Sequence, residues 1–201
     1  ELNREYDIQL DEERKEILVI LKALTKEIAE HKELIQAYQD LLTRLDFIHA
    51  KTKLAMDMNC VMPNINSDFE MELIDAYHPI LRKTNTNLGK KTFPQQLKMD
   101  KFSRMLVISG PNAGGKSITL KTVGLLQVML QSGLMVPVDP NSKMFFYKKI
   151  LTDIGDNQSI ENELSTYSYR LKRMNYFLNV TNKRTLLLLD EFGTGSDPDL
   201  G

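Results

Sequence analysis

The most informative segment of the sequence reads Leu106-Val107-Ile108-Ser109-Gly110-Pro111-Asn112-Ala113-Gly114-Gly115-Lys116-Ser117. An apolar run is followed by glycine, four residues, Gly-Lys-Ser and a helix-forming run over 118–129, the pattern of a strand, a phosphate-binding loop and a helix. Backbone N–H groups of such a loop surround anionic oxygens, and the helix start adds about half a positive unit charge. The segment therefore predicts a site for nucleotide phosphates.

Lys116 and Ser117 carry the side-chain chemistry of this loop. We expect Lys116 to reach the β- and γ-phosphates and the Ser117 hydroxyl to coordinate Mg²⁺. Glycines at 110, 114 and 115 let the backbone adopt positive φ and approach phosphate without a Cβ atom in the way. The alternative interpretation is a chance match in a glycine-rich turn.

A second apolar run ends in two carboxylates. Residues 185–191 read Thr-Leu-Leu-Leu-Leu-Asp-Glu, as expected of a buried parallel strand that delivers charge to the carboxyl edge of a sheet. Asp190 is expected to hold Mg²⁺ through water, and Glu191 to polarise the attacking water. The alternative, an acidic turn after a core strand, is less favoured downstream of a phosphate-binding loop.

Composition limits the class of protein. A chain of 201 residues suits one or two domains, and its net charge of −1 gives no overall basic field for nucleic acid. The single cysteine, Cys60, excludes an intramolecular disulfide and fits a reducing cytosol. No apolar run approaches eighteen residues, so we expect a cytoplasmic protein without a membrane partner. The absence of an initial methionine and the end at Gly201 suggest a piece of a longer protein.

The N-terminal part of the chain has a helical pattern. From Asp11 to about Met58 there is no proline or glycine, and apolar residues recur with heptad spacing. This predicts one long helix, up to roughly 70 Å, or two packed helices. Such a stripe needs a partner helix, from elsewhere in the protein or a second copy. His31 and His49 lack a cluster of other ligands and are interpreted as seam or surface residues.

The remaining chain is expected to form an α/β domain over 63–201, after a helical arm over 1–62. The alternation at Phe69, Met71 and Leu73 predicts a half-buried strand. Other predicted elements are strands at 96–99 and 104–109, a polar loop at 82–91, a strand pair or a strand with an irregular exit within 144–153, a functional loop at 153–161, and a helix opened by Ser165 or a neighbouring hydroxyl and ending near Val180. The early strands suggest a small antiparallel layer beside the main sheet.

Three motifs together resemble the MutS family of DNA-repair ATPases. They are the loop at 110–117, Leu-Ser-Thr-Tyr-Ser at 164–168 and Asp-Glu-Phe-Gly-Thr-Gly at 190–195. The segments at 153–161 and 195–198 are more similar to the second bacterial branch, the MutS-II type that restrains recombination. Residues 45–51 look like the end of that branch's lever helices.

The resemblance implies an ABC-type P-loop ATPase that uses ATP and Mg²⁺ and works as a homodimer sharing nucleotide between subunits. It implies that Ser165 contacts the γ-phosphate in trans and that Phe93 and Pro94 lie beside the adenine. Asn112 and Gln158 are weaker candidates for contacts with phosphate or water. Ala113 departs from the residue most common in the family, with little expected consequence. The family also implies binding of DNA, including mismatched DNA, a C-terminal endonuclease domain absent from this sequence and, for some members, action on stalled ribosomes.

Two other functions stay open from the sequence. One is a clamp that ATP closes on DNA, with slow and incidental hydrolysis. The other is a generic ABC-type chromosome ATPase head with a coiled-coil arm. The latter usually carries a glycine-rich signature after leucine-serine, whereas Thr166 and Tyr167 follow here.

Overall fold

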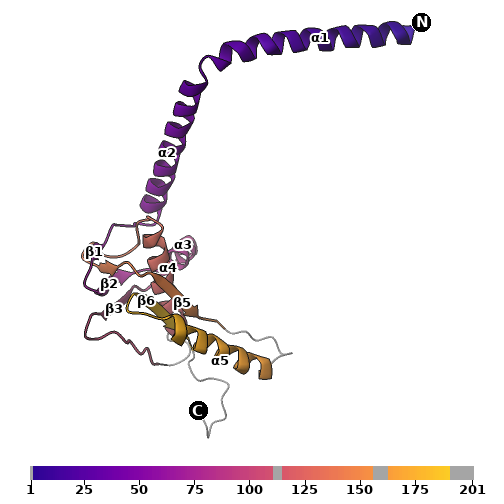
Figure 1. The fold of residues 1–201 in the computed structure, drawn as a ribbon. Coiled ribbons are helices and arrows are strands. Elements are labelled where there is room, and N and C mark those ends of the chain that lie inside the picture. Colours follow the sequence, from indigo (N-terminus) through magenta and orange to yellow (C-terminus); the bar gives the residue numbers. More distant parts are fainter. Residues whose placement is uncertain (1, 111–114, 156–162, 191–201) are drawn as a thin grey trace. The chain divides into compact units, whose positions relative to one another are not determined.

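The computed structural model describes residues 2–110, 115–155 and 163–190. The chain divides into two compact units, Glu1–Thr52 and Lys53–Gly201, which we treat separately. Figure 1 shows the order of the elements along the chain.

The first unit contains helix α1 (Leu2–Ala29) and most of helix α2 (Lys32–Asp57). A turn at residues 30–31 separates them, and the His31 carbonyl accepts the first hydrogen bond of α2 from Ile35 N–H at 2.9 Å. Two helices were one of the predicted alternatives, but they do not bury their apolar residues against each other, since Leu21 is 52% and Leu42 64% exposed. The partner helix expected for this stripe, from elsewhere in the protein or a second copy, stays a prediction. A stripe of this kind is buried only against another apolar surface, and no described segment covers it. His31 and His49 are exposed.

The second unit begins with a four-stranded sheet in the order β1-β4-β2-β3. Its strands are β1 (Asn64–Asn66), β4 (Lys143–Phe145), β2 (Met71–Ala76) and β3 (Gln95–Met99). Strand β2 pairs antiparallel with β3 and β4, whereas β1 and β4 are parallel. The predicted antiparallel layer is therefore confirmed for β2–β3, and the sheet as a whole is mixed. Met71 and Leu73 face the core as the alternation predicted.

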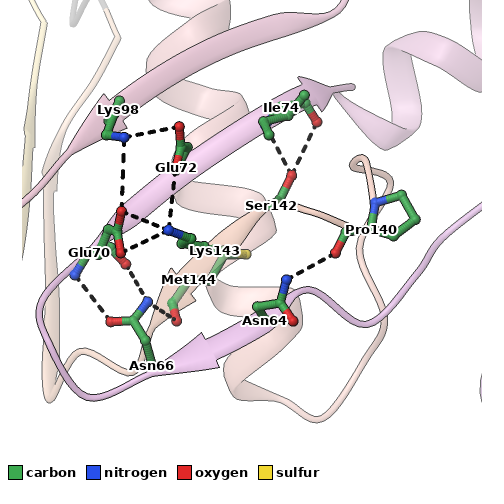
Figure 2. Close-up of polar contacts among 10 residues, drawn as sticks. All are labelled: Asn64, Asn66, Glu70, Glu72, Ile74, Lys98, Pro140, Ser142, Lys143 and Met144. Carbon is green, nitrogen blue, oxygen red and sulfur yellow. Dashed lines mark hydrogen bonds and ion pairs between the residues drawn. The ribbon is translucent and has the colours of Figure 1, made fainter.

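Side-chain contacts on the polar face of this sheet tie its strands together (Figure 2). Lys98 on β3 lies 3.2 Å from Glu72 Oε1, and Lys143 on β4 lies 3.2 Å from Glu70 Oε1. Weaker crossed pairs at 3.8–4.0 Å join the same four charges into one network. The Asn66 amide donates to the carbonyls of Glu70 and Met144, which holds the β1–β2 connection against β4. Alternating charges on neighbouring strands favour this register.

Two further strands form a separate pair. Strands β5 (Lys149–Asp153) and β6 (Thr185–Leu189) are parallel, with Lys149 opposite Thr185 and Asp153 opposite Leu189. Strands β4 and β5 are thus consecutive but lie in different sheets, so the predicted pair within 144–153 is two strands that do not pair with each other. Leu186 and Leu188 are buried, which confirms the predicted core strand at 185–189.

Helix α4 (Lys116–Gln131) confirms the predicted helix-forming run over 118–129, and it packs along the core. Its buried side chains include Val123, Leu126 and Leu130. The buried Gln127 amide donates to the Phe145 carbonyl at 2.8 Å, which fixes the helix against the end of β4. The helix ends at Ser132-Gly133, where Gly133 has φ 72°, a conformation that favours glycine.

Helix α3 (Pro79–Asn87) occupies most of the predicted polar loop at 82–91, and that prediction is wrong. His78 is the N-cap, and its Nδ1 accepts a hydrogen bond from Leu81 N–H at 3.3 Å. Pro79 follows at a position where the missing N–H has no intrahelical partner to lose. The helix is therefore started by His78 and Pro79, which precede the polar run, whereas the polar composition of the run itself suggested a loop.

Two other local predictions differ from the structure. Residues 103–109 form no strand, and Met105 and Val107 are 82% and 79% exposed. A strand needs a neighbour to pair its backbone groups, and none of the described strands pairs with this segment. Helix α5 (Glu163–Val180) ends as predicted but begins two residues before Ser165, which is therefore its third residue and not its N-cap.

In the described part of the chain, every helix is too short or too polar to span a bilayer.

Candidate nucleotide-binding site

The two ends of the predicted phosphate loop lie close together. Lys116 is the first residue of α4, and its ammonium donates to the Gly110 carbonyl at 2.5 Å. The side chain thus reaches back across the loop to the residue six positions earlier. This contact places a positive charge at the mouth of the loop, where phosphate oxygens are expected.

Gly115 starts the helix in a conformation suited to anion binding. It is the N-cap of α4 with φ 81° and ψ 13°, in the left-handed region that costs glycine little. A Cβ atom here would also lie 3.3 Å from Ile118 Cγ2. A glycine cap lacks the side-chain oxygen that Ser, Thr, Asp or Asn would offer to the first N–H groups. Such a helix start is suited to an external anion.

Ser117 and Thr119 occupy the first turn of α4. Ser117 is half-buried beside Lys116, as expected for a hydroxyl that coordinates a metal on the phosphates. Thr119 was not predicted as important, yet its hydroxyl contacts the Gln95 carboxamide oxygen at 2.7 Å and the Gly115 carbonyl at 3.0 Å. The helix start is thereby attached to β3.

This attachment brings the predicted adenine contacts near the loop. Phe93 and Pro94 directly precede Gln95, so they lie beside the residue that binds Thr119. The Phe93 ring is 70% exposed, and the Lys91 ammonium lies 5.4 Å from its centre. An exposed aromatic ring with a cation nearby is chemically able to stack on a purine. The roles of both residues stay predictions.

Asp190 follows β6 and is half-buried. Its N–H donates to the Asp153 carbonyl at 2.8 Å, which extends the β5–β6 pairing by one residue. Helix α4 packs against β6 through Gly124 and Leu188. The helix that begins at Lys116 and the strand that leads to Asp190 are therefore neighbours, although the roles of their end residues stay predictions.

Asp153 and Arg173 form a second cluster at this edge that the motif analysis did not identify. Arg173 on α5 lies 3.3 Å from the Asp153 carboxylate, and it also donates to the Thr152 carbonyl. Asp153 was predicted as the start of a functional loop, but its partner lies 20 positions later. Only the tertiary structure reveals this pair.

The other predicted site residues lie outside the described residues or lack described side chains. Ser165 is placed only as part of helix α5. Those outside the described residues are Pro111, Asn112, Ala113, Gly114, Gln158 and Glu191.

The donor set fits a nucleotide with its magnesium ion better than a metal held by protein alone. Within the described ranges, no three His, Cys, Asp or Glu side chains gather closely enough to hold a metal. Mg²⁺ commonly keeps several waters and takes only one or two protein ligands besides phosphate oxygens. The predicted ligands, the Ser117 hydroxyl and the Asp190 carboxylate, agree with this small number of protein ligands.

Comparison with known proteins bears on the same region. A family profile described as MutS domain V matches residues 106–200. The chain is also similar to proteins named endonuclease MutS2, with 42% identity over 201 residues in Finegoldia magna, 40% over 200 residues in Lactobacillus helveticus and 40% over 200 residues in Shouchella clausii. Each alignment covers 100% of this chain and 25% of the relative, so the chain spans about a quarter of the length of these curated relatives.

Proposed function

Because this chain belongs to the MutS family and resembles its MutS2 members along its whole length, we propose that residues 63–201 form an ABC-type domain that binds and hydrolyses ATP. Residues 1–62 would be the helical arm that communicates with the rest of the protein. The observation that carries the proposal is the contact of Lys116 with Gly110 at the glycine-capped start of α4.

The proposed chemistry is attack of water on the γ-phosphate, in line with the bond that breaks. Lys116 binds the β- and γ-phosphate oxygens and stabilises the charge that develops on them. Ser117 and Asp190 would hold Mg²⁺, which supplies further positive charge at the same oxygens. Glu191 orients the attacking water and accepts its proton. The loop backbone from Gly110 to Gly115 surrounds the phosphates with N–H donors.

The whole protein is proposed to act on DNA as a homodimer. The relatives are named endonucleases, which supports a nucleic-acid substrate. Ser165 at the start of α5 would contact the γ-phosphate bound by the second subunit, so nucleotide binding would draw the subunits together. Hydrolysis would then release them from DNA recombination or repair intermediates.

Titration calorimetry with MgATP tests the proposal directly. The wild-type protein is compared with Lys116→Ala and with Lys121→Ala, which removes the same charge from an exposed position on the same helix. We expect micromolar binding by the wild type and by Lys121→Ala, and binding about 10- to 100-fold weaker in Lys116→Ala, since hydrogen bonds to charged groups contribute roughly 1.5–3 kcal/mol. Light scattering with and without nucleotide measures dimerisation. Equal affinity in all three folded proteins would overturn the proposed phosphate site.

A further inference from the structure

We propose that Arg173 is a positioning residue that clamps helix α5 to the edge of the β5–β6 sheet next to the metal ligand Asp190. The inference rests on the proposed ATPase function and assigns a residue outside its recognised motifs. It is carried by two contacts that meet at Asp153, one from a side chain and one from the backbone.

The first contact joins α5 to β5. The Arg173 guanidinium lies 3.3 Å from Asp153 Oδ1 and donates in addition to the Thr152 carbonyl, so it grips the last two residues of the strand. The Asp153 side chain is only 14% exposed and that of Arg173 33% exposed. A charge-assisted pair in such a setting has fixed geometry, and loss of one partner leaves the other charge poorly solvated. The Arg173 guanidinium also lies 5.6 Å from the ring of the buried Phe177.

The second contact joins β5 to Asp190. The Asp153 carbonyl accepts the Asp190 N–H at 2.8 Å. Asp153 therefore binds α5 through its carboxylate and positions Asp190 through its backbone. A shift of α5 that pulls on the Asp153 side chain would move the hydrogen-bond acceptor that fixes Asp190.

The strand register places the two helices on opposite faces of the pair. Leu188 contacts α4, and side chains alternate along a strand, so Leu189 points to the other face. Asp153 lies opposite Leu189 in the parallel register and shares that face, where Arg173 meets it. Figure 1 shows α5 beside β5 and β6. Helices α4 and α5 thus pack on opposite faces of the two-stranded β5–β6 sheet, and Asp190 directly follows its strand β6.

The clamp has a directional consequence. Ser165 precedes Arg173 by eight residues, about 12 Å along a helix. Because a helix moves as a stiff rod, a contact made at Ser165 would be transmitted to Arg173 and from there to Asp190. Loss of Arg173 should therefore weaken the binding of Mg²⁺, in which Asp190 would take part, more than the binding of ATP without metal, in which the loop at 110–116 would take part.

The test compares wild type, Arg173→Ala and Arg173→Lys, with Lys172→Ala as the matched loss of an exposed neighbouring charge. ATP affinity is measured in excess EDTA and across a Mg²⁺ titration, and turnover is measured across the same titration. For Arg173→Ala we expect about a tenfold higher Mg²⁺ concentration at half-maximal turnover, since partners that orient a metal ligand typically contribute 10- to 100-fold in metal affinity. Affinity in EDTA should stay within about twofold. Arg173→Lys should recover part of the shift, and Lys172→Ala should show none.

The outcomes separate the clamp from the proposed ATPase. A wild-type protein that does not bind MgATP contradicts the ATPase function itself. A wild type that binds, beside an Arg173→Ala variant with unchanged Mg²⁺ dependence, overturns the clamp and leaves the ATPase intact. Equal weakening with and without Mg²⁺ also overturns it, because a purely structural role would give that result. If Arg173→Ala does not fold, Asp153→Asn replaces it, with a smaller shift expected in the same direction.

Discussion

Gly124 of α4 and Leu188 of β6 approach so closely that a Cβ atom at position 124 would lie 2.9 Å from Leu188 Cδ1. Leu188 is only 5% exposed, so its methyl group has little room to move away. Glycine in mid-helix is normally unfavourable by about 1 kcal/mol relative to alanine. Close packing between the phosphate-binding helix and the strand that leads to Asp190 accounts for its presence here.

Gly124→Ala is expected to lower the free energy of unfolding by about 1 kcal/mol. Overpacking a core costs roughly 1–3 kcal/mol, which exceeds the helix-propensity gain of about 1 kcal/mol. In a Leu188→Ala background, where the opposing methyl group is gone, the same change should instead stabilise by about 1 kcal/mol. Urea unfolding of the four proteins in this double-mutant cycle measures the coupling. Identical effects of Gly124→Ala in both backgrounds would show that the two residues do not interact.

Ser142 offers a second stability prediction, at the start of β4. Its side chain is fully buried, and its hydroxyl accepts from Ile74 N–H at 3.0 Å and donates to the Ile74 carbonyl at 3.2 Å (Figure 2). The carbonyl has another donor in Asp139 N–H, but Ser142→Ala would leave the Ile74 N–H unpaired. We expect a loss of about 1–3 kcal/mol in unfolding free energy. Ser103→Ala, at an exposed serine, is the control, and equal stability of the two variants would contradict the role of this hydroxyl.

Glu191→Gln addresses catalysis and not folding. A glutamine can still accept a hydrogen bond from water but cannot take its proton, so turnover should fall about 10²- to 10⁴-fold while ATP affinity stays within a few fold. Single-turnover hydrolysis and calorimetry of the full-length protein measure the two quantities. Glu33→Gln, which makes the same change on the exposed surface of α2, controls for the loss of charge. Turnover like that of the wild type would remove Glu191 from the proposed mechanism.

Local sequence patterns predicted the helices and strands in which buried side chains recur at regular intervals. Alternation at Met71 and Leu73 identified β2, and the leucine run ending at Leu189 identified β6, because buried side chains recur with the period of the backbone. Helix α3 was missed because its polar sequence shows no such period. Its start depends on the ring nitrogen of His78, which no count of apolar residues reveals.

Pairing partners were the other limit of sequence analysis. The apolar run at 104–109 has the composition of a strand, but a strand also requires another segment to pair with it, and none of the described strands does so. The site shows the same division. Its loop and carboxylates form contiguous motifs. The contact of Thr119 with Gln95 instead joins residues 24 positions apart, and that of Arg173 with Asp153 joins residues 20 positions apart. Such contacts follow from topology, so only the folded chain identifies them.

His78 gives α3 a dependence on pH. Burial lowers the pKa of His78 below its usual value, and the nearby positive charge of Lys121 acts in the same direction, although a hydrogen bond with the backbone partly opposes them. The unfolded chain therefore takes up a proton at a higher pH than the folded protein. The contribution of His78 is fully present above about pH 6.5, the ordinary value for histidine, and is lost as the pH falls toward the lowered pKa of the folded state. Protonation of Nδ1 would also remove the acceptor for Leu81 N–H.

Variants of His78 test this dependence on pH. Asparagine caps helices well and does not titrate in this range, so the stability of His78→Asn relative to wild type should increase as the pH is lowered from 7.5 to 5.5. His78→Ala should be less stable than His78→Asn by about 1 kcal/mol at both pH values, which separates capping from titration. Urea unfolding at the two pH values measures these differences, and a constant gap between wild type and His78→Asn would show that His78 does not couple protonation to folding.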